Sequence, residues 1–245
     1  MNLQGKTVLT FDCHGTLIDW ETGIWSVLEP FCARHKKPIG QDALLELFAA
    51  LEAQAESGPY IPYREVLATV LKGIGTRLGF EVGDHEALAF PESVGDWPAF
   101  PDSAGALASL KKRFKLAVIT NCDDDLFAAS NERLKVKFDC IITAQQAGSY
   151  KPSANNFQLA FRRLGVPRDQ ILHVAQSLFH DHVPARKLGL STVWINRRHN
   201  MTGSGATMPA DVKPDYEFPD MQSFALAAMQ RSRAHVYSTS SPLSI

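Results

Sequence analysis

Three side chains in the sequence could together displace a leaving group through an ester intermediate: Asp12, Lys151 and Asp181. A carboxylate nucleophile, a positioned amine and a second carboxylate are sufficient for displacement through an ester intermediate. The ammonium group of Lys151 would lower the pKa of Asp12, keep its carboxylate ionised and limit its repulsion with Asp181. Thr16 and Asn121 could orient the nucleophile or bind the departing group.

Asp12 follows a short apolar segment. Val8, Leu9 and Phe11 favour a β-strand, and the segment ends at the carboxylate and then at Gly15. We expect a buried strand that delivers Asp12 to a loop at its carboxyl end, the edge at which ligands bind in an open α/β sheet. Because a charge beside a buried strand is costly unless it is paired, Asp12 requires a partner or a chemical role.

Beyond residue 102, segments that favour strands alternate with helical patterns. We expect strands at 115–120, 140–143, 171–175, 191–195 and, more weakly, 216–218. We expect helices from Asp102 or Ser103 to about 113, and at about 123–135, 153–164 and 221–229. This alternation predicts a Rossmann-like α/β core with a parallel sheet covered on both faces.

Polar residues follow four of the predicted strands, and Asp12 with Thr16 follows the first. Thr120 and Asn121 end one strand, Lys151 lies beyond the next, and Asp181 lies in a predicted loop of residues 177–182 after the fourth. Any one of them could simply cap a helix or finish a turn. The ordered set at one edge of the sheet favours a functional site.

Residues 20–95 contain no clear strand. Helical patterns at 22–34, 42–55 and 64–78 predict an all-helical insert that covers the strand end carrying Asp12. We therefore expect an α/β core formed by residues 1–17 and 98–245 and an α-helical cap of residues 18–97. Residues 200–210 and the serine-rich end from about Ser232 are expected to be loop or tail.

The composition favours small-molecule chemistry. The 245 residues include 25 Lys and Arg against 26 Asp and Glu, so no basic field indicates nucleic acid or an anionic membrane as partner. No signal core or membrane span is evident, and the four scattered cysteines fit reduced thiols, so we expect a cytoplasmic protein. The sequence does not fix the oligomeric state, and a homodimer stays open.

The ordered motifs resemble a known family. The chain contains, in order, FDCHGTLIDW, VITN, YKP and SLFHD, with the helical insert directly after the first, and is similar to the haloacid dehalogenase (HAD) superfamily. The WINR stretch at 194–197 and the FD-x-x-GT-L-x-DW form resemble its 2-haloacid dehalogenase (type II) branch. The similarity extends to about residue 225.

The resemblance implies a role for each matching position. Asp12 would be the nucleophile, Thr16 would hydrogen-bond beside it, and Lys151 would be the family lysine. Asp181 would help activate the water that attacks the ester. The substrate-binding candidates are His14, Thr120, Asn121 and Ser177. The reaction implied is hydrolytic dehalogenation of a small 2-haloacid, which requires no metal or other cofactor.

Two alternatives stay open. One is a magnesium-dependent phosphomonoesterase that would use Asp12 and Asp181 as metal ligands and His14 as acid or base. Phosphatases of the superfamily carry an Asp where this chain has His14 and an additional acid where it has Gln176, so a hard cation should bind more weakly here. The other alternative is a non-catalytic member that binds a metabolite or a partner.

The chain also departs from the dehalogenase pattern. Known members place Tyr where His14 stands, and His14 could be a proton donor or only part of the pocket wall. No arginine stands in the context of the cap arginine that holds the substrate carboxylate, which leaves Arg34 and Arg64 as candidates.

Aromatic residues and histidines complete the candidates. His180 and His182 flank Asp181 and make a transition-metal site conceivable, whereas His173 in its apolar strand is expected to be a satisfied core residue. The aromatic residues that could form an apolar pocket around the nucleophile are Trp20, Trp25, Trp97 and Phe179.

Overall fold

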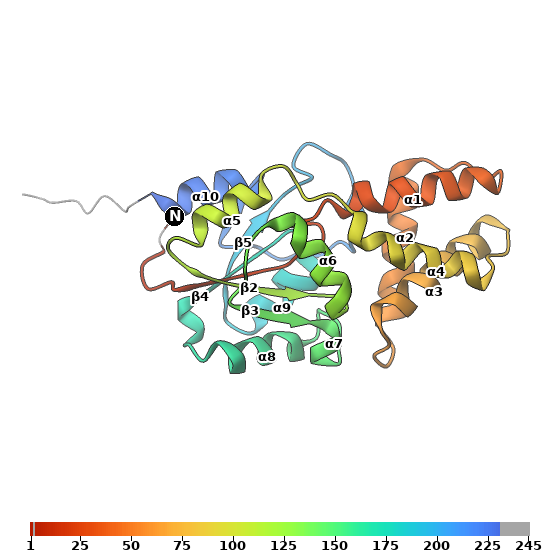
Figure 1. Ribbon diagram of the computed structural model, residues 1–245. Helices are drawn as coiled ribbons and strands as arrows, with labels where there is room; N and C mark the ends of the chain where they lie inside the picture. The colour runs from red at the N-terminus through yellow and green to blue at the C-terminus, as the bar shows by residue number, and fades with distance from the viewer. Residues whose placement is uncertain (2, 231–245) are drawn as a thin grey trace, which may run out of the picture.

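The computed structural model describes residues 1 and 3–230 (Figure 1). Its centre is a six-stranded parallel sheet in the order β3-β2-β1-β4-β5-β6. The strands are β1 Val8–Phe11, β2 Lys115–Thr120, β3 Cys140–Thr143, β4 Ile171–Ala175, β5 Ser191–Ile195 and β6 Tyr216–Phe218. The α/β prediction and all six strand positions are confirmed.

The strand order places β1 in the middle of the sheet. From β1 the chain builds β2 and β3 on one side, and then returns to add β4, β5 and β6 on the other. Ligands of open α/β sheets bind at such a reversal, outside the carboxyl ends of the strands. The ends of β1 and β4 are therefore the expected place for a site.

Alternate residues of β1 face opposite layers of helices. Leu9 and Phe11 belong to a large core that includes residues of α5, α6 and α10. Val8 faces a smaller core with α8 and α9. These helices are α5 Ser103–Leu110, α6 Asp124–Leu134, α8 Ala154–Leu164, α9 Val183–Lys187 and α10 Met221–Met229, with the short α7 Ala144–Ala147 before α8. In Figure 1, α5 and α10 lie on one side of the sheet and α8 on the other.

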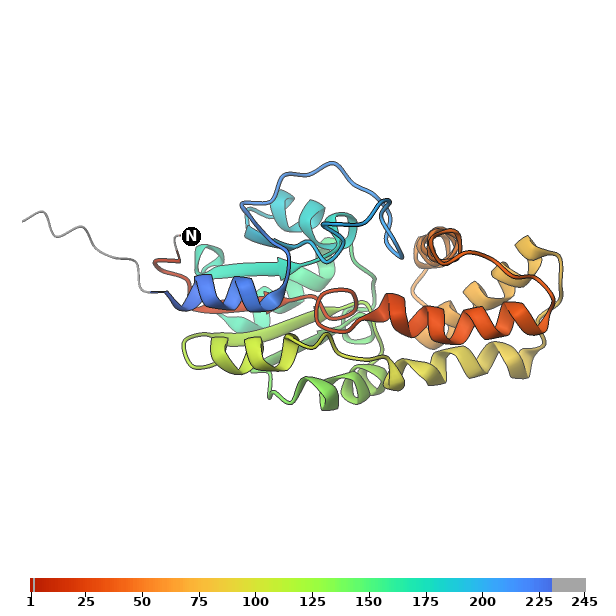
Figure 2. The ribbon, with the colours of Figure 1, turned by 90° about the horizontal axis from the view of Figure 1, so that it is seen from above.

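The segment after β1 is entirely helical, as predicted. It contains α1 Trp20–Arg34, α2 Gln41–Glu56, α3 Tyr63–Leu78, α4 Asp84–Glu92 and the short 3-10 helix η1 Ser93–Asp96. Figure 2 shows α1–α4 gathered at one end of the sheet. The two connecting stretches run side by side, because Asp19 N donates to Pro98 O and Phe100 N donates to Leu17 O. The helical segment is thus joined to the sheet by two connecting stretches that are hydrogen-bonded to each other.

Some local predictions were wrong. The stretch predicted as a loop at 177–182 is a helical turn, η3 Leu178–His182, because the Ser177 side chain accepts the backbone N–H of His180. Helix α5 begins at Ser103, as predicted, but it ends at Leu110 instead of near residue 113, and the side chain of its N-cap residue Asp102 makes no capping hydrogen bond. The carboxylate of Asp102 instead accepts the N–H groups of Met221 and Gln222 at the start of α10.

The remaining predictions for the chain have mixed outcomes. Residues 200–210 form turns and loop, as expected. The serine-rich end from Ser232 lies outside the described residues. Within the described part of the chain, none of the helices combines the length and the apolar character that a membrane crossing requires.

Candidate active site

Asp12, Lys151 and Asp181 meet in one buried cluster at the carboxyl edge of the sheet. Lys151 Nζ donates to Asp12 Oδ1 at 2.8 Å, to Asp181 Oδ1 at 2.7 Å and to the carbonyl oxygen of Ile119 at 2.9 Å. All three ammonium hydrogens are therefore used. The lysine holds two carboxylates that are 139 and 30 positions away along the chain.

The backbone fixes each member of the cluster. Asp12 N donates to Val174 O, which ties the end of β1 to β4. Gly15 has a φ of +90°, which allows the tight turn that follows Asp12. Asn121, after β2, accepts the backbone N–H of Lys151 at 2.7 Å and donates to its carbonyl at 3.0 Å. Neighbouring strand ends thus position both charges.

Thr16 lies behind the other oxygen of Asp12. Its hydroxyl donates to Asp12 Oδ2 at 2.6 Å and accepts the backbone N–H of Gln176 at 2.8 Å. Because that N–H occupies the hydroxyl oxygen, the hydroxyl hydrogen is directed to the carboxylate. Each oxygen of Asp12 therefore faces a donor.

The two carboxylates differ in their electrostatics. Burial raises the pKa of Asp12, and the opposing effect of Lys151 does not overcome it. Our expectation of a lowered pKa was therefore wrong in its net direction, because it ignored desolvation. Burial also penalises ionised Asp181, but Lys151 and the hydrogen bond from His173 hold the pKa of Asp181 well below its usual range. Asp181 is the more firmly ionised of the two.

His173 orients Asp181. Its Nε2 lies 2.9 Å from Asp181 Oδ1, and its Nδ1 lies 2.9 Å from the hydroxyl of Thr10. The histidine is fully buried and satisfied, as expected, but it contacts the cluster instead of serving the core alone. Asp181 Oδ2 has no partner among the described protein atoms. One oxygen of Asp181 is thus held and the other is free.

A cavity of about 30 Å³ lies against this cluster. Such a volume holds roughly two water molecules, so the site as it stands accepts only a small ligand. Seven of the predicted site residues line it: Asp12, His14, Thr120, Asn121, Lys151, Ser177 and Asp181. Thr16 does not line the cavity, but its hydroxyl is hydrogen-bonded to Asp12, which does.

Comparisons with known proteins identify the family of the chain. The family model of the haloacid dehalogenase-like hydrolases matches residues 6–175 of the chain. The chain belongs to this family. An (S)-2-haloacid dehalogenase of Pseudomonas putida is 25% identical over 224 residues, which cover 88% of this chain and 92% of that protein.

Solved structures share the fold over nearly the whole chain. An L-2-haloacid dehalogenase superposes with a TM-score of 0.77 at 23% identity and covers 92% of this chain and 99% of its own. The L-2-haloacid dehalogenase of Xanthobacter autotrophicus with chloropropionic acid covalently bound has a TM-score of 0.74 at 19% identity, with 91% and 98% covered. The haloacid dehalogenase-like fold, with its helical segment after the first strand, is therefore confirmed.

Five further residues line the cavity, and two of them, Trp20 and His180, lie within the motifs FDCHGTLIDW and SLFHD. The five are Trp20, Glu52, Glu56, Tyr63 and His180, of which only Trp20 was expected in the pocket. Glu52 accepts a hydrogen bond from the hydroxyl of Tyr63 at 2.7 Å, and burial raises the pKa of Glu52 to about 8. A signal for Glu52 existed in the sequence, since it lies four and eight positions beyond Phe48 and Leu44 on the apolar face of α2.

Neither candidate arginine reaches the cavity. Arg64 begins α3 and pairs with Asp125 at 2.6 Å and with Glu92. Arg34 ends α1, where its guanidinium lies 5.5 Å from the centre of the Phe31 ring. No arginine of residues 1 and 3–230 lines the cavity. The family's cap arginine therefore has no counterpart at this site.

His14 stands in the cavity wall. Its Nε2 lies 3.2 Å from the hydroxyl of Ser130, and its ring packs edge-on against Trp97. Burial lowers the pKa of His14 to about 4. The imidazole is therefore neutral near pH 7, which removes the charged acid that a phosphatase mechanism would draw from it.

The residues present do not fit a magnesium ion. Mg²⁺ requires several oxygen ligands in near-ideal octahedral geometry, but the Oδ1 atoms of Asp12 and Asp181 both face the ammonium group of Lys151. The position that would supply another acid holds Gln176, which lines neighbouring cavities instead. The ring of His182 is hydrogen-bonded to the carbonyl oxygen of Ala175. His180 and His182 therefore do not converge on a metal.

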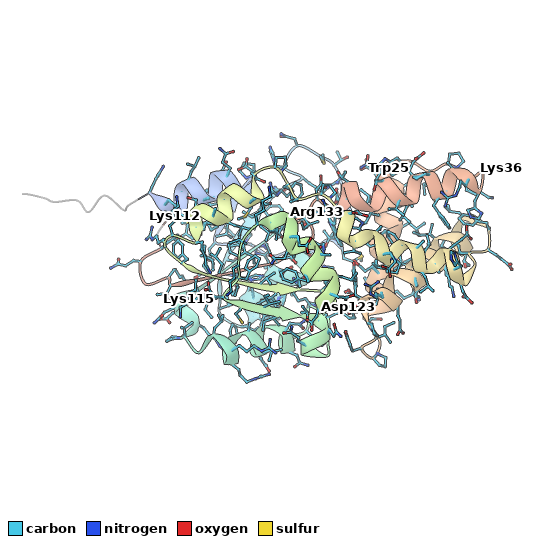
Figure 3. The ribbon with its side chains drawn as sticks, in the orientation of Figure 1. Trp25, Lys36, Lys112, Lys115, Asp123 and Arg133 are labelled. Carbon is cyan, nitrogen blue, oxygen red and sulfur yellow. The ribbon has the colours of Figure 1, made fainter. Side chains whose placement is uncertain are left out.

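The helical segment is fastened to the sheet beside the cavity. The Asp123 carboxylate, in the loop after β2, accepts the backbone N–H groups of Tyr63 and Arg64 at 3.0 and 3.1 Å. These are unpaired donors of the first turn of α3. Figure 3 labels Asp123 where the two parts of the molecule meet. The contact holds Tyr63 at the cavity that Asp12 also lines.

Proposed function

We propose that this protein hydrolyses the carbon–halogen bond of a small 2-halocarboxylic acid through an ester of Asp12. The observation that carries the proposal is the arrangement of Asp12 between Lys151 and Thr16 beside a small cavity. The 2-haloacid dehalogenases among its relatives support the reaction class. The covalent adduct of the Xanthobacter enzyme supports an ester intermediate.

The first step is a displacement at carbon. A carboxylate oxygen of Asp12 forms a bond to the halogen-bearing carbon, and the halide departs with the electron pair of the broken bond. The halide needs no proton, so no acid is required. The other oxygen of Asp12 becomes the ester carbonyl, and whichever oxygen attacks, the remaining one faces Lys151 or Thr16 as a hydrogen-bond donor.

The second step is hydrolysis of the ester. Water adds to the Asp12 carboxyl carbon, and the bond between that carbon and the alkyl oxygen breaks to release the hydroxy acid. Asp181 Oδ2, which lacks a protein partner, accepts a hydrogen from the water and orients it. The proton passes to the departing alkoxide oxygen, and Asp12 returns as a carboxylate. The hydroxyl oxygen of the product comes from Asp12.

We further propose that residues 18–97 act as a cap and residues 1–17 and 98–245 as the core. The paired crossings at Asp19–Pro98 and Leu17–Phe100 support this division. We propose that the reaction uses no metal, because both Oδ1 atoms of the carboxylates face an ammonium group. The free thiols of all four cysteines fit a reducing compartment such as the cytoplasm.

The test is a single turnover of 2-chloropropionate in ¹⁸O-labelled water. The first hydroxy acid released should carry unlabelled oxygen, and Asp12→Asn should release no halide. A chelator should leave the rate unchanged. Labelled oxygen in the first product would contradict the ester mechanism, and phosphate release from a phosphomonoester that stops with chelator would favour the phosphatase.

A further inference from the structure

Buried polar atoms without a partner gather around the cavity. Among the described residues, Thr120 Oγ1, Glu56 Oε1, His180 Nε2 and Asp181 Oδ2 are buried and make no hydrogen bond to protein, and all four residues line the cavity. Buried polar atoms are normally paired, so a group of unpaired ones requires an explanation. The water of the second step accounts for Asp181. The water does not account for the other three atoms, which are available to hydrogen-bond a ligand.

A substrate carboxylate would meet no available cation in this cavity. Lys151 already directs its three hydrogens to Asp12, Asp181 and the Ile119 carbonyl. Arg64 is committed to Asp125 and Glu92 outside the cavity. Because a buried anion without a partner is strongly disfavoured, a 2-haloacid requires neutral hydrogen-bond donors here.

The contacts of Glu56 indicate which of its oxygens can donate. Both polar atoms of the Asn121 side chain pair with the backbone of Lys151, which fixes the orientation of the amide. The amide nitrogen also donates to Glu56 Oε2 at 3.2 Å. Oε2 is thus an acceptor, and Oε1 is the atom that carries the hydrogen of the protonated acid. Burial and the neighbouring charge of Glu52 raise the pKa of Glu56 well above its usual range.

His180 presents a second neutral group beside Glu56. Its Nε2 lies 3.9 Å from Glu56 Oε2, and its Nδ1 lies 3.2 Å from the hydroxyl of Ser177. The Ser177 oxygen also lies 2.9 Å from the Thr207 hydroxyl. When Thr207 donates to Ser177, the single Ser177 hydroxyl hydrogen is directed to Nδ1, and the ring hydrogen is then on Nε2. Burial lowers the pKa of His180 to about 4, so the ring is uncharged near pH 7.

We infer that Glu56, acting as a protonated carboxyl group, and His180 bind the carboxylate of the substrate in place of the missing arginine. The Thr120 hydroxyl supplies a third donor. The inference rests on the proposed 2-haloacid reaction and identifies the groups that recognise the acid. A carboxylate accepts all three hydrogens, and such charge-assisted hydrogen bonds are strong. The amide group of 2-chloropropionamide has only one acceptor oxygen for these three donors. Its two N–H hydrogens would face donors instead of acceptors.

Other titratable groups surround Glu56 and set the pH at which it ionises. They come from α2, α3, the loop after β3 and η3, and they are Glu52, Tyr63, Tyr150, Lys151 and His180. Once Glu56 ionises, it loses its hydrogen and repels the substrate. The KM for 2-chloropropionate should therefore rise with pH, while the pKa values of the two aspartates act mainly on kcat.

The decisive comparison uses Glu56→Gln and Glu56→Ala. The Gln amide donates from the Oε1 position and accepts from Asn121 at the other, so Glu56→Gln should keep KM low and remove its rise with pH. Glu56→Ala should raise KM by roughly 10- to 150-fold, as for the loss of a hydrogen bond to a charged group. Glu52→Gln is the matched control. It should retain the rise but at lower pH, since Glu52 raises the pKa of Glu56.

Binding to the Asp12→Asn variant separates this inference from the proposed reaction. Calorimetry on that variant should show 2-chloropropionate binding more tightly than 2-chloropropionamide, and the preference should disappear when Glu56→Ala is added. Equal or tighter binding of the amide would overturn the inference even if the wild-type enzyme releases halide. An unchanged KM in Glu56→Ala would overturn it as well. If the wild type releases no halide but this preference is found, only the reaction fails.

Discussion

Replacement of Lys151 by methionine tests the electrostatics of the cluster most directly. Methionine has a similar length but no charge, so Lys151→Met leaves Asp12 and Asp181 buried without a cation. Removing one partner of a buried ion pair costs about 3–5 kcal/mol. For a domain of this size, each kcal/mol lowers the melting temperature by about 2–4 °C, so we expect a loss of roughly 6–20 °C near neutral pH. Halide release should be abolished.

The pH dependence makes this prediction specific. The pKa of Asp181 is lowered in the folded wild type, so its contribution to stability is present above the unfolded value of about 4 and is lost as pH falls through the folded pKa. In Lys151→Met, burial raises the pKa of both aspartates. The variant therefore loses stability relative to wild type as pH rises from about 4 to 7.

Thermal unfolding monitored at about pH 4 and pH 7 provides the assay for this prediction. Lys111→Met is the matched control, because Lys111 pairs with Asp139 at the partly exposed surface, where such a pair contributes about 0–1 kcal/mol. The control should change the melting temperature by a few degrees at most. An equal loss for Lys151→Met at both pH values would refute the argument, since it would indicate lost packing and not unpaired charge.

Three further substitutions test the supporting contacts. Thr16→Val removes the 2.6 Å hydrogen bond to Asp12 and should lower kcat by roughly 10- to 150-fold with little change in KM; steady-state kinetics will show whether it does. Asp123→Ala removes the acceptor at the start of α3, so it should cost about 1–2 kcal/mol in a denaturant titration and raise KM, and unchanged values of both would contradict the fastening role. His173→Phe frees the side chain of Asp181 and should slow ester hydrolysis more than ester formation, so mass spectrometry should detect an alkylated chain during turnover.

The sheet and the central cluster could be predicted because local patterns determine them. The apolar residues of β1 end directly at Asp12, and parallel strands bring their carboxyl ends to one edge whatever the loops between them. Strand positions were therefore reliable. Lys151 and Asp181 could be assigned to the cluster from their places after strands, without any knowledge of side-chain contacts.

The cap side of the site could not be predicted in the same way. The buried stripe of α2 includes Glu52, because α2 packs against α1 and α3 and also lines the cavity. Glu52 and Glu56 follow an apolar helix face, where a glutamate is ordinarily solvated. His180 was predicted to lie in a loop, and only the turn capped by Ser177 brings its ring into the cavity. These positions depend on tertiary contacts between distant segments.

The three hydrogen bonds of Lys151 have a consequence for the course of the reaction. In the resting site one ammonium group is shared by two carboxylates, so the buried cluster carries an excess negative charge. In the proposed reaction, alkylation of Asp12 would remove that excess and leave a single matched pair between Lys151 and Asp181. Burial that penalises the free nucleophile thus favours its modified form. In the proposed ester intermediate the buried charges of Lys151 and Asp181 balance. Hydrolysis of the ester regenerates the Asp12 carboxylate and with it the excess negative charge of the cluster.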